Sequence, residues 1–134
     1  MIVIFGVGQM GSHLALQLEG EGQEVAVIDP DRHNLENLGQ EFKGLMVMGL
    51  GIDRDVLTRA RVKEASCFVA VARDPNTNIM AALVAKTQLK VPRVIARIED
   101  PVLVDLYQRH GIEPISPTAD AAREIGDMIL SRSC

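Results

Sequence analysis

Three glycines near the start of the chain, Gly6, Gly8 and Gly11, follow the spacing G-x-G-x-x-G. In this spacing the first glycine allows a tight turn, the second lets the backbone approach a diphosphate, and the third lets a helix pack closely on a strand. The free amide groups at the helix start, around Gln9 and Met10, would face the phosphates, and the helix dipole would add attraction. The segment therefore predicts a nucleotide-binding loop. The alternative is a strand–helix turn that holds no ligand.

A carboxylate, Asp29, ends the second apolar run about 20 residues after the glycines, where an acid can bind both hydroxyl groups of a ribose. An acid at this place should repel a 2′-phosphate, so the sequence favours NAD(H) over NADP(H). Arg32 lies close enough in the sequence to weaken that preference. The alternative interpretation makes Asp29 a turn residue before Pro30.

Further candidates for ligand contact lie at the ends of three other apolar runs, because ligands of open parallel sheets gather beyond the carboxyl edge. The glycines that flank Leu50 in "MGLG" would let the backbone approach an adenine ring, with a plain turn as the alternative. Ala72 and Arg73 end the fourth run, and Arg97 ends the fifth. An arginine at such a place can contact phosphate or an acidic partner. It can equally form an ion pair with the acids two and three positions later.

Alternating strands and helices must position these candidates. Most of the short runs rich in β-branched residues are apolar throughout, which is typical of strands covered on both faces of a parallel sheet. The five runs are residues 2–5, 24–28, 45–48, 67–72 and 93–97. Between the first two runs, Met10, Leu14 and Leu18 repeat along one face of a predicted helix.

Helix starts are marked by a capping residue directly before a proline. The three pairs are Asp74-Pro75, Asp100-Pro101 and Ser116-Pro117. Gly111 indicates the C-terminal end of the helix that precedes it. The order of elements predicts an α/β fold of the Rossmann-like type, an open doubly wound parallel sheet in a single domain. The last helix, at about residues 117–130, can detach from the rest.

Size and charge restrict the function classes. A chain of 134 residues with a net charge of -4 fits one domain and disfavours binding to nucleic acid. No apolar run approaches the roughly 18 residues that cross a bilayer, so we expect no direct membrane insertion. Cys67 and Cys134 cannot form a disulfide framework, and a reducing cytoplasm fits them.

Residues for catalysis are not recognisable. Six strands and their helices would use up the chain and leave no substrate domain. The tyrosine–lysine pair of short-chain dehydrogenases is missing, because Gly111 stands at the fourth position after Tyr107. His13, His33 and His110 fall on separate predicted elements, which disfavours a metal site. We therefore expect no enzyme, and a small NAD-dependent oxidoreductase is the less favoured alternative.

Several longer stretches resemble one family. "GVGQMG", "VIDPD", "MGLGIDRDVL", "FVAVARDPNTNIMAALVAK", "VIARIEDP" and "GIEPISP" are similar to the RCK-type (regulator of potassium conductance) N-terminal domain of Trk and Ktr potassium-uptake regulatory subunits. The resemblance implies a cytoplasmic domain that binds NAD(H) or ATP, ADP or AMP. It further implies a partner, a potassium transporter subunit at the inner membrane, and a homodimer or larger ring. A related regulatory domain of a potassium/proton antiporter is the alternative.

The resemblance also implies roles for individual residues. The diphosphate would lie on Gly6, Val7, Gly8, Gln9 and Met10. The ribose would lie on Asp29, and the adenosine half near Ala72 and Arg73, with Arg97 as a further contact.

Two departures from the family pattern bear on the ligand. Glutamine stands at position 9 where ATP-preferring relatives often have arginine, which favours NAD(H) or a less charged adenine nucleotide. Leu50 stands where many relatives carry an acid.

The last helix has a narrow apolar face, made of Ala122, Ile125, Met128 and Ile129. The resemblance favours this helix as a crossover helix at a dimer interface over packing on its own domain. Full-length relatives usually add a C-terminal lobe, so the chain can be an excised N-terminal domain.

Overall fold

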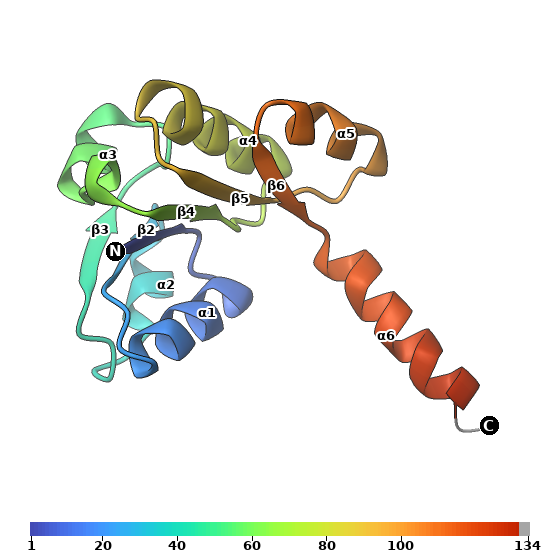
Figure 1. Ribbon diagram of the computed structural model, residues 1–134. Helices are drawn as coiled ribbons and strands as arrows, with labels where there is room; N and C mark the ends of the chain where they lie inside the picture. Colours follow the sequence, from blue (N-terminus) through green and yellow to red (C-terminus); the bar gives the residue numbers. More distant parts are fainter. Residues whose placement is uncertain (132–134) are drawn as a thin grey trace.

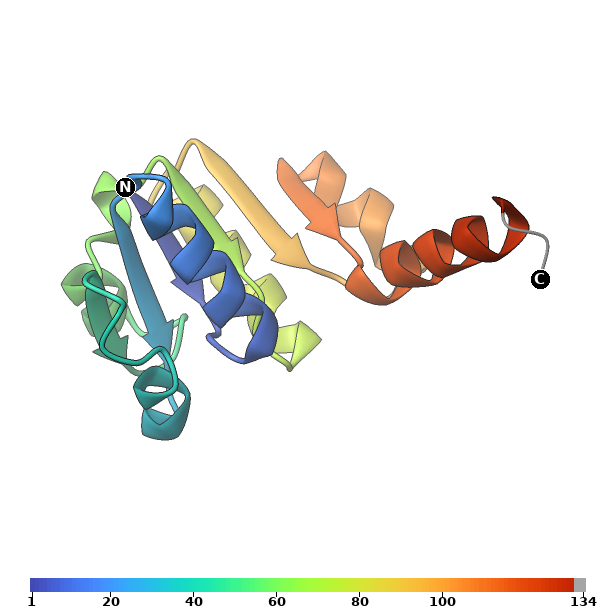
Figure 2. The ribbon, with the colours of Figure 1, turned by 90° about the horizontal axis from the view of Figure 1, so that it is seen from below.

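The computed structural model describes residues 1–131 and contains one six-stranded, fully parallel sheet (Figures 1 and 2). The spatial order is β3-β2-β1-β4-β5-β6. The strands β1 and β4 therefore lie side by side at the centre, and the later strands of each half are added outwards from them. The strands are β1 (Ile2–Phe5), β2 (Val25–Asp29), β3 (Leu45–Met48), β4 (Cys67–Ala70), β5 (Arg93–Arg97) and β6 (Ile112–Ile115). This order is that of the doubly wound dinucleotide-binding fold, so the predicted fold class is confirmed.

Helices cover both faces of the sheet. In Figure 1, α1 and α2 lie below the sheet and α3, α4 and α5 lie above it. The helices are α1 (Gln9–Gly20), α2 (Arg32–Glu36), α3 (Arg54–Arg59), α4 (Pro75–Leu83), α5 (Pro101–Arg109) and α6 (Pro117–Ser131). A short 3-10 helix, Val62–Glu64, follows α3, and a π-helical segment, Val84–Gln88, continues α4.

The core has two layers because the central strands are apolar on both faces. Ile4 and Val27 pack with α1 and α2 in one layer, and Phe5 and Phe68 pack with α3 and α4 in the other. The predicted stripe Met10, Leu14 and Leu18 faces the first layer.

The strand bounds differ from the prediction at three places. The run 24–28 is shifted by one residue to β2, and the run 67–72 is shortened to β4, since the chain turns towards α4 after Ala70. The sixth strand is not among the predicted apolar runs, because Glu113 and Pro114 interrupt its pattern.

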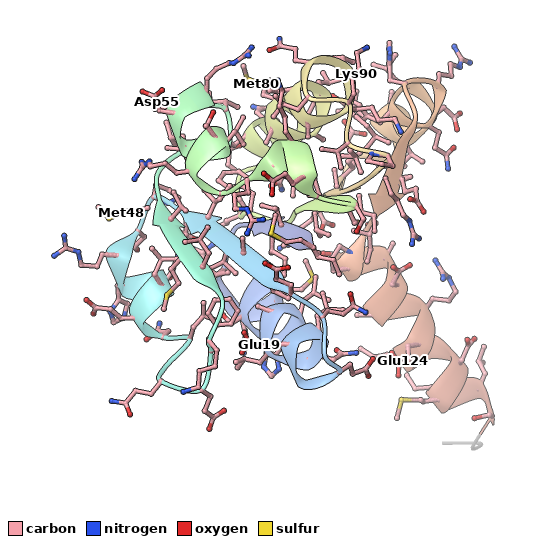
Figure 3. All side chains as sticks on the ribbon, turned by 60° about the vertical axis from the view of Figure 1, so that its left-hand side comes forward. Glu19, Met48, Asp55, Met80, Lys90 and Glu124 are labelled. Carbon is pink, nitrogen blue, oxygen red and sulfur yellow. The ribbon has the colours of Figure 1, made fainter. Side chains whose placement is uncertain are left out.

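The strand β3 is less covered than predicted. Leu45, Met46 and Met48 are each more than 40% exposed, and Met48 points outward in Figure 3. The reason is its place at the sheet edge, where the neighbouring helix α2 has only five residues.

Capping side chains begin the helices as predicted at two positions. Asp74 accepts a hydrogen bond from the Asn76 amide at 3.0 Å, and Asp100 accepts one from the Val102 amide at 2.9 Å. The third predicted start is also correct, since α6 begins at Pro117. Gly111 follows the end of α5 with a φ of 80°, which agrees with the predicted helix stop.

The last helix, α6, extends away from the sheet (Figures 1 and 2). No side chain within it is buried, and Ile125 and Met128 are 57% and 59% exposed. The alternative in which α6 packs on its own domain is therefore wrong. Cys134 lies outside the described residues. None of the helices in residues 1–131 has the length and apolar character to cross a bilayer.

Candidate functional site

A cleft of about 970 Å³ opens at the carboxyl edge of the sheet, at the ends of the paired strands β1 and β4. Ligands of open α/β sheets bind at this point, because the chain leaves the two strands towards opposite faces. The lining comes from the ends of strands β1 to β5, the segments that follow them, and helices α1, α2, α4 and α6: Phe5, Gly6, Gly8, Gln9, Met10, His13, Asp29, Pro30, Asp31, Asn34, Leu50, Val71, Ala72, Arg73, Asp74, Thr77, Arg97 and Pro117.

The three glycines have the backbone roles that the sequence predicts for them. Gly6 has a φ of 95°, and a Cβ there would overlap the backbone of Ala72. A Cβ on Gly11 would overlap the carbonyl oxygen of Gly6, so a side chain would push α1 away from the loop. A Cβ on Gly8 would meet nothing within 4 Å, which means that the backbone there faces open space. Only Gly8 therefore offers room for a ligand against the main chain.

The carboxylate of Asp29 is buried and holds the loop together. Its Oδ2 accepts a hydrogen bond from the Val7 amide at 2.9 Å, and its Oδ1 accepts one from the Asp31 amide at 2.8 Å. The side-chain amide of Asn34 lies 3.3 Å from both oxygens. Asp29 thus acts as a turn residue, and it also lines the cleft where a ribose would lie.

On the opposite side of the cleft, Asn78 fixes the loop that follows β4. This side chain is fully buried, accepts a hydrogen bond from the Ala72 amide at 2.7 Å, and donates one to the Ala72 carbonyl at 2.7 Å. The side-chain amide of Asn78 thereby gives the backbone of Ala72 the two hydrogen bonds that a neighbouring strand would otherwise provide. Because Ala72 also packs against Gly6, Asn78 sets the distance between the two loops.

A polar chain leads from the cleft to α6. Arg97, which lines the cleft and is 30% exposed, donates from Nε to Oε1 of Glu99 at 3.0 Å. The hydroxyl of Ser116 donates to Oε2 of Glu99 at 3.5 Å.

Burial disfavours the ionised form of the Glu99 carboxyl, but hydrogen bonds from Thr118, Arg97 and Ser116 outweigh it. The pKa of Glu99 therefore lies below its usual range.

Most of the predicted ligand residues are brought together in the cleft: Gly6, Gly8, Gln9, Met10, Asp29, Leu50, Ala72, Arg73 and Arg97. Val7 and Gly11 are not part of the lining. The Val7 amide donates to Asp29, and Gly11 is buried within α1, on the side that faces the loop. Arg32 begins α2 on the outside and is also not part of the lining. For these three residues the predicted ligand contact has no support in the geometry.

Several lining residues were missed by the sequence analysis: His13, Asp31, Asn34, Asp74, Thr77 and Pro117. The helical spacing carries a signal for His13, which stands one turn after Gln9 and so shares its face. Asn78 also has a signal, since it is the polar residue in a run of α4 that is otherwise apolar at the buried positions.

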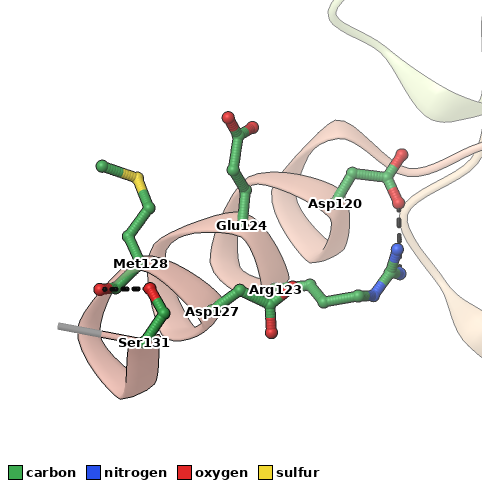
Figure 4. A pocket seen from close by; sticks show the side chains of 6 residues that line it. All are labelled: Asp120, Arg123, Glu124, Asp127, Met128 and Ser131. Carbon is green, nitrogen blue, oxygen red and sulfur yellow. Dashed lines mark hydrogen bonds and ion pairs between the residues drawn. The ribbon is translucent and has the colours of Figure 1, made fainter.

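A second groove, of about 410 Å³, runs along α6 (Figure 4). All of its lining residues belong to that one helix, so it is the open surface of α6 rather than a binding cavity. Within residues 1–131, no group of three or more histidine, cysteine or acidic residues could hold a metal ion.

Comparison with known proteins places the chain in a family. The TrkA-N domain matches residues 2–117. A Trk system potassium uptake protein, TrkA of Streptomyces coelicolor, is 45% identical over 131 residues, which are 98% of this chain and 57% of that protein. The chain spans about half the length of the curated relatives that it matches.

Solved structures share the fold. The AMP-bound Kef CTD of Shewanella denitrificans has a TM-score of 0.79 at 22% identity, covering 97% of this chain and 79% of that chain. The GsuK channel bound to NAD has a TM-score of 0.71 at 23% identity, covering 87% of this chain and 21% of that chain. The sequence matches and the shared fold agree, and this chain belongs to the TrkA-N domain family.

Proposed function

We propose that this chain is the nucleotide-sensing domain of a Trk-type potassium-uptake system and that it binds NAD(H) or an adenine nucleotide in the cleft. The observation that carries the proposal is the open main chain at Gly8, beyond the ends of the paired strands β1 and β4. There the amides at the start of α1 can receive a diphosphate. The NAD-bound GsuK channel and the AMP-bound Kef CTD, which share this fold, support the same ligand class.

The charges around the cleft suit a dinucleotide. Asp29 and Asp31 lie on the β2 side, where carboxylates can accept hydrogen bonds from ribose hydroxyls. Arg73 and Arg97 lie on the β4 and β5 side, where guanidinium groups can bind phosphate. A ligand with its diphosphate over Gly8 and a nucleoside on each side would satisfy all three regions.

Sensing explains the chain better than catalysis. Hydride transfer needs a substrate site and a proton-handling group beside the nicotinamide. The cleft at the sheet edge, of about 970 Å³, has room for a dinucleotide, and the S. coelicolor relative is named a potassium uptake protein. That 45% identity favours potassium uptake over antiporter regulation. The domain would work in the cytoplasm, bound to a membrane potassium transporter.

The free helix α6 supports assembly of several copies. Its exposed apolar side chains, Ile125, Met128 and Ile129, need a cover in water. On the same chain, α5 exposes Val102 and Leu106, so a second copy offers a matching apolar surface. We propose that α6 crosses to a second copy and forms a homodimer, from which larger rings can be built. A ligand can shift such an assembly only through its differential affinity for two arrangements.

Calorimetric titration of the purified chain with NAD⁺, NADH, AMP, ADP and ATP tests the ligand. We expect binding of at least one of them, with NAD(H) among the tightest, and weaker binding by a Gly8→Val variant whose side chain fills the approach. If none of the five nucleotides gives a measurable heat of binding, the nucleotide proposal is refuted. The transport role is tested by expressing the protein in cells that lack their own regulator and measuring whether potassium uptake is restored.

A further inference from the structure

The structure links the anion-binding side of the cleft to the base of α6 through one carboxylate. Arg97 reaches into the cleft and is paired with Glu99, and Glu99 in turn accepts the hydroxyl of Ser116, the residue before α6. We propose that Glu99 is a positioning residue that transmits nucleotide binding from Arg97 to the direction of α6. This inference rests on the proposed nucleotide-binding function and names the route of its regulation.

The first step is competition for Arg97. A guanidinium group has five donors in a fixed plane and binds phosphate in pairs of hydrogen bonds. The only carboxylate that it contacts among the described residues is Glu99, at 3.0 Å. A diphosphate carries two negative charges against the one of Glu99, so an arriving ligand draws the guanidinium group of Arg97 towards its phosphates and loosens this pair.

The second step is the response of Glu99. Its two oxygens hold different elements: Oε1 holds Arg97, and Oε2 holds Ser116. When Arg97 leaves, the carboxylate is free to turn wholly towards the hydroxyl groups of Ser116 and Thr118 at the helix start. The backbone next to it stays fixed, because the Ile98 amide donates to the Ile115 carbonyl at 2.9 Å.

The third step is amplification by the helix itself. With 15 residues and no buried side chain, α6 is held to the sheet mainly at its first turn. A rise of about 1.5 Å per residue makes α6 about 22 Å long, so a small rotation at Pro117 becomes a shift of several ångströms at its far end. The same helix carries the apolar face proposed to bind a second copy, which couples ligand and assembly.

A second ion pair, between β5 and β6, provides the control. Arg93 of β5 donates to Glu113 of β6 at 2.6 Å, so this arginine is also paired with a carboxylate near the β6 edge of the sheet. Neither Arg93 nor Glu113 lines the cleft. Glu113→Gln therefore removes a comparable charge pair without touching the proposed route.

The experiment uses the whole chain with NAD⁺ as the probe. Hydrogen–deuterium exchange of the backbone amides in residues 118–122 is measured with and without NAD⁺, and the dimer dissociation constant is measured by sedimentation. For the native chain and for Glu113→Gln we expect saturating NAD⁺ to change both readouts by about fivefold or more. For Glu99→Gln we expect the response to fall below about twofold, with NAD⁺ affinity within about threefold of native.

A double variant, Ser116→Ala with Thr118→Val, removes the two hydroxyl groups that donate to Glu99 and leaves Arg97 in place. The double variant should bind NAD⁺ with the affinity of the native chain, but NAD⁺ should no longer change the amide exchange of α6 or the dimer dissociation constant. If either Glu99→Gln or the double variant responds to NAD⁺ as the native chain does, the coupling is refuted. Binding of NAD⁺ by the native chain without any response of α6 refutes the coupling alone. Absence of binding by the native chain instead refutes the proposed nucleotide function.

Discussion

The backbone amide of Val7 donates a hydrogen bond to Oδ2 of Asp29 across 2.9 Å, which ties the glycine loop to the end of β2. The acid that sequence patterns assign to a ribose is thus already part of the scaffold of the site. A ribose hydroxyl can bind Asp29 only where lone pairs remain beside the amides of Val7 and Asp31.

Asp29→Ala should therefore affect stability as well as binding. The change leaves buried amide donors unpaired, and we expect a loss of about 3 kcal/mol in the free energy of unfolding, measured in urea. NAD(H) affinity measured by calorimetry should fall in the same variant. Asp31→Asn is the control, because an asparagine keeps the cap of α2 on the His33 amide, so the free energy of unfolding should change by less than about 0.5 kcal/mol. Unchanged stability and affinity in Asp29→Ala would contradict both roles.

The glycines Gly11 and Gly8 should separate folding from binding. Gly11→Ala places a methyl group against the carbonyl of Gly6, and we expect a destabilisation of about 2 kcal/mol or more, since backbone rather than a flexible side chain must move. Gly8→Ala meets open space, so its thermal midpoint should stay close to native while nucleotide affinity falls. A stable Gly11→Ala protein with native affinity would show that α1 can move freely against the loop.

Asn78→Leu should disorder the loop after β4. The variant keeps the volume roughly but leaves both polar groups of Ala72 without their partners, at a cost of about 2 to 4 kcal/mol. Nucleotide affinity should fall further than stability alone explains, because Arg73 follows directly on this loop. Asn76→Leu, at an exposed position of the same helix, is the matched comparison and should leave the affinity unchanged.

Ile125→Asp should prevent assembly through α6 without unfolding the domain. Ile125 is 57% exposed in the isolated chain, so its replacement should leave the thermal midpoint of dilute protein nearly unchanged. Burying a carboxylate in a dimer interface is costly, and sedimentation should show at least a tenfold weaker dimer. Glu124→Gln on the neighbouring polar side should assemble normally. A native dimer in Ile125→Asp would place the contact elsewhere.

The pair of Arg93 and Glu113 should stabilise the sheet edge at neutral pH and lose this effect in acid. The hydrogen bond from Arg93 holds the pKa of Glu113 below its usual range. A carboxyl with a depressed pKa stabilises the fold above its unfolded pKa, about 4.3, and this contribution is lost as the pH falls through the folded value. Arg93→Met should lower the urea midpoint slightly at pH 7 and leave it unchanged near pH 2, where Glu113 is protonated in both states. The pair is exposed, so the effect is small and should shrink in high salt.

The fold was predictable because its signals are local. Apolar strands, a capping residue before the three prolines that begin helices, and the glycine spacing each restrict the backbone within a few residues. The same locality explains the errors. Glu113 and Pro114 hide β6, whose place at the sheet edge is set by pairing with β5 rather than by its own pattern.

The part of the candidate site that is formed by the backbone, at Gly6, Gly8 and the strand ends, was predictable from the sequence. The part that side chains complete across long sequence distances was not predictable. The roles of Asn78 and Glu99 appear only when Ala72 and Ser116 are placed beside them. The direction of α6 could not be deduced either. An apolar helix face indicates that another surface covers it, but it does not indicate whether that surface belongs to the same chain or to a second copy.

The uncovered edge at β3 has a consequence for how such chains behave in a crowded solution. On its outer side the backbone N–H and C=O groups of β3 face water, and its exposed methionine and leucine side chains favour association with other molecules. Four residues are too few for a lasting strand-to-strand junction between molecules, and this brevity is the protection that the edge has. Any mutation that lengthened β3 would open a path to aggregation that does not require unfolding.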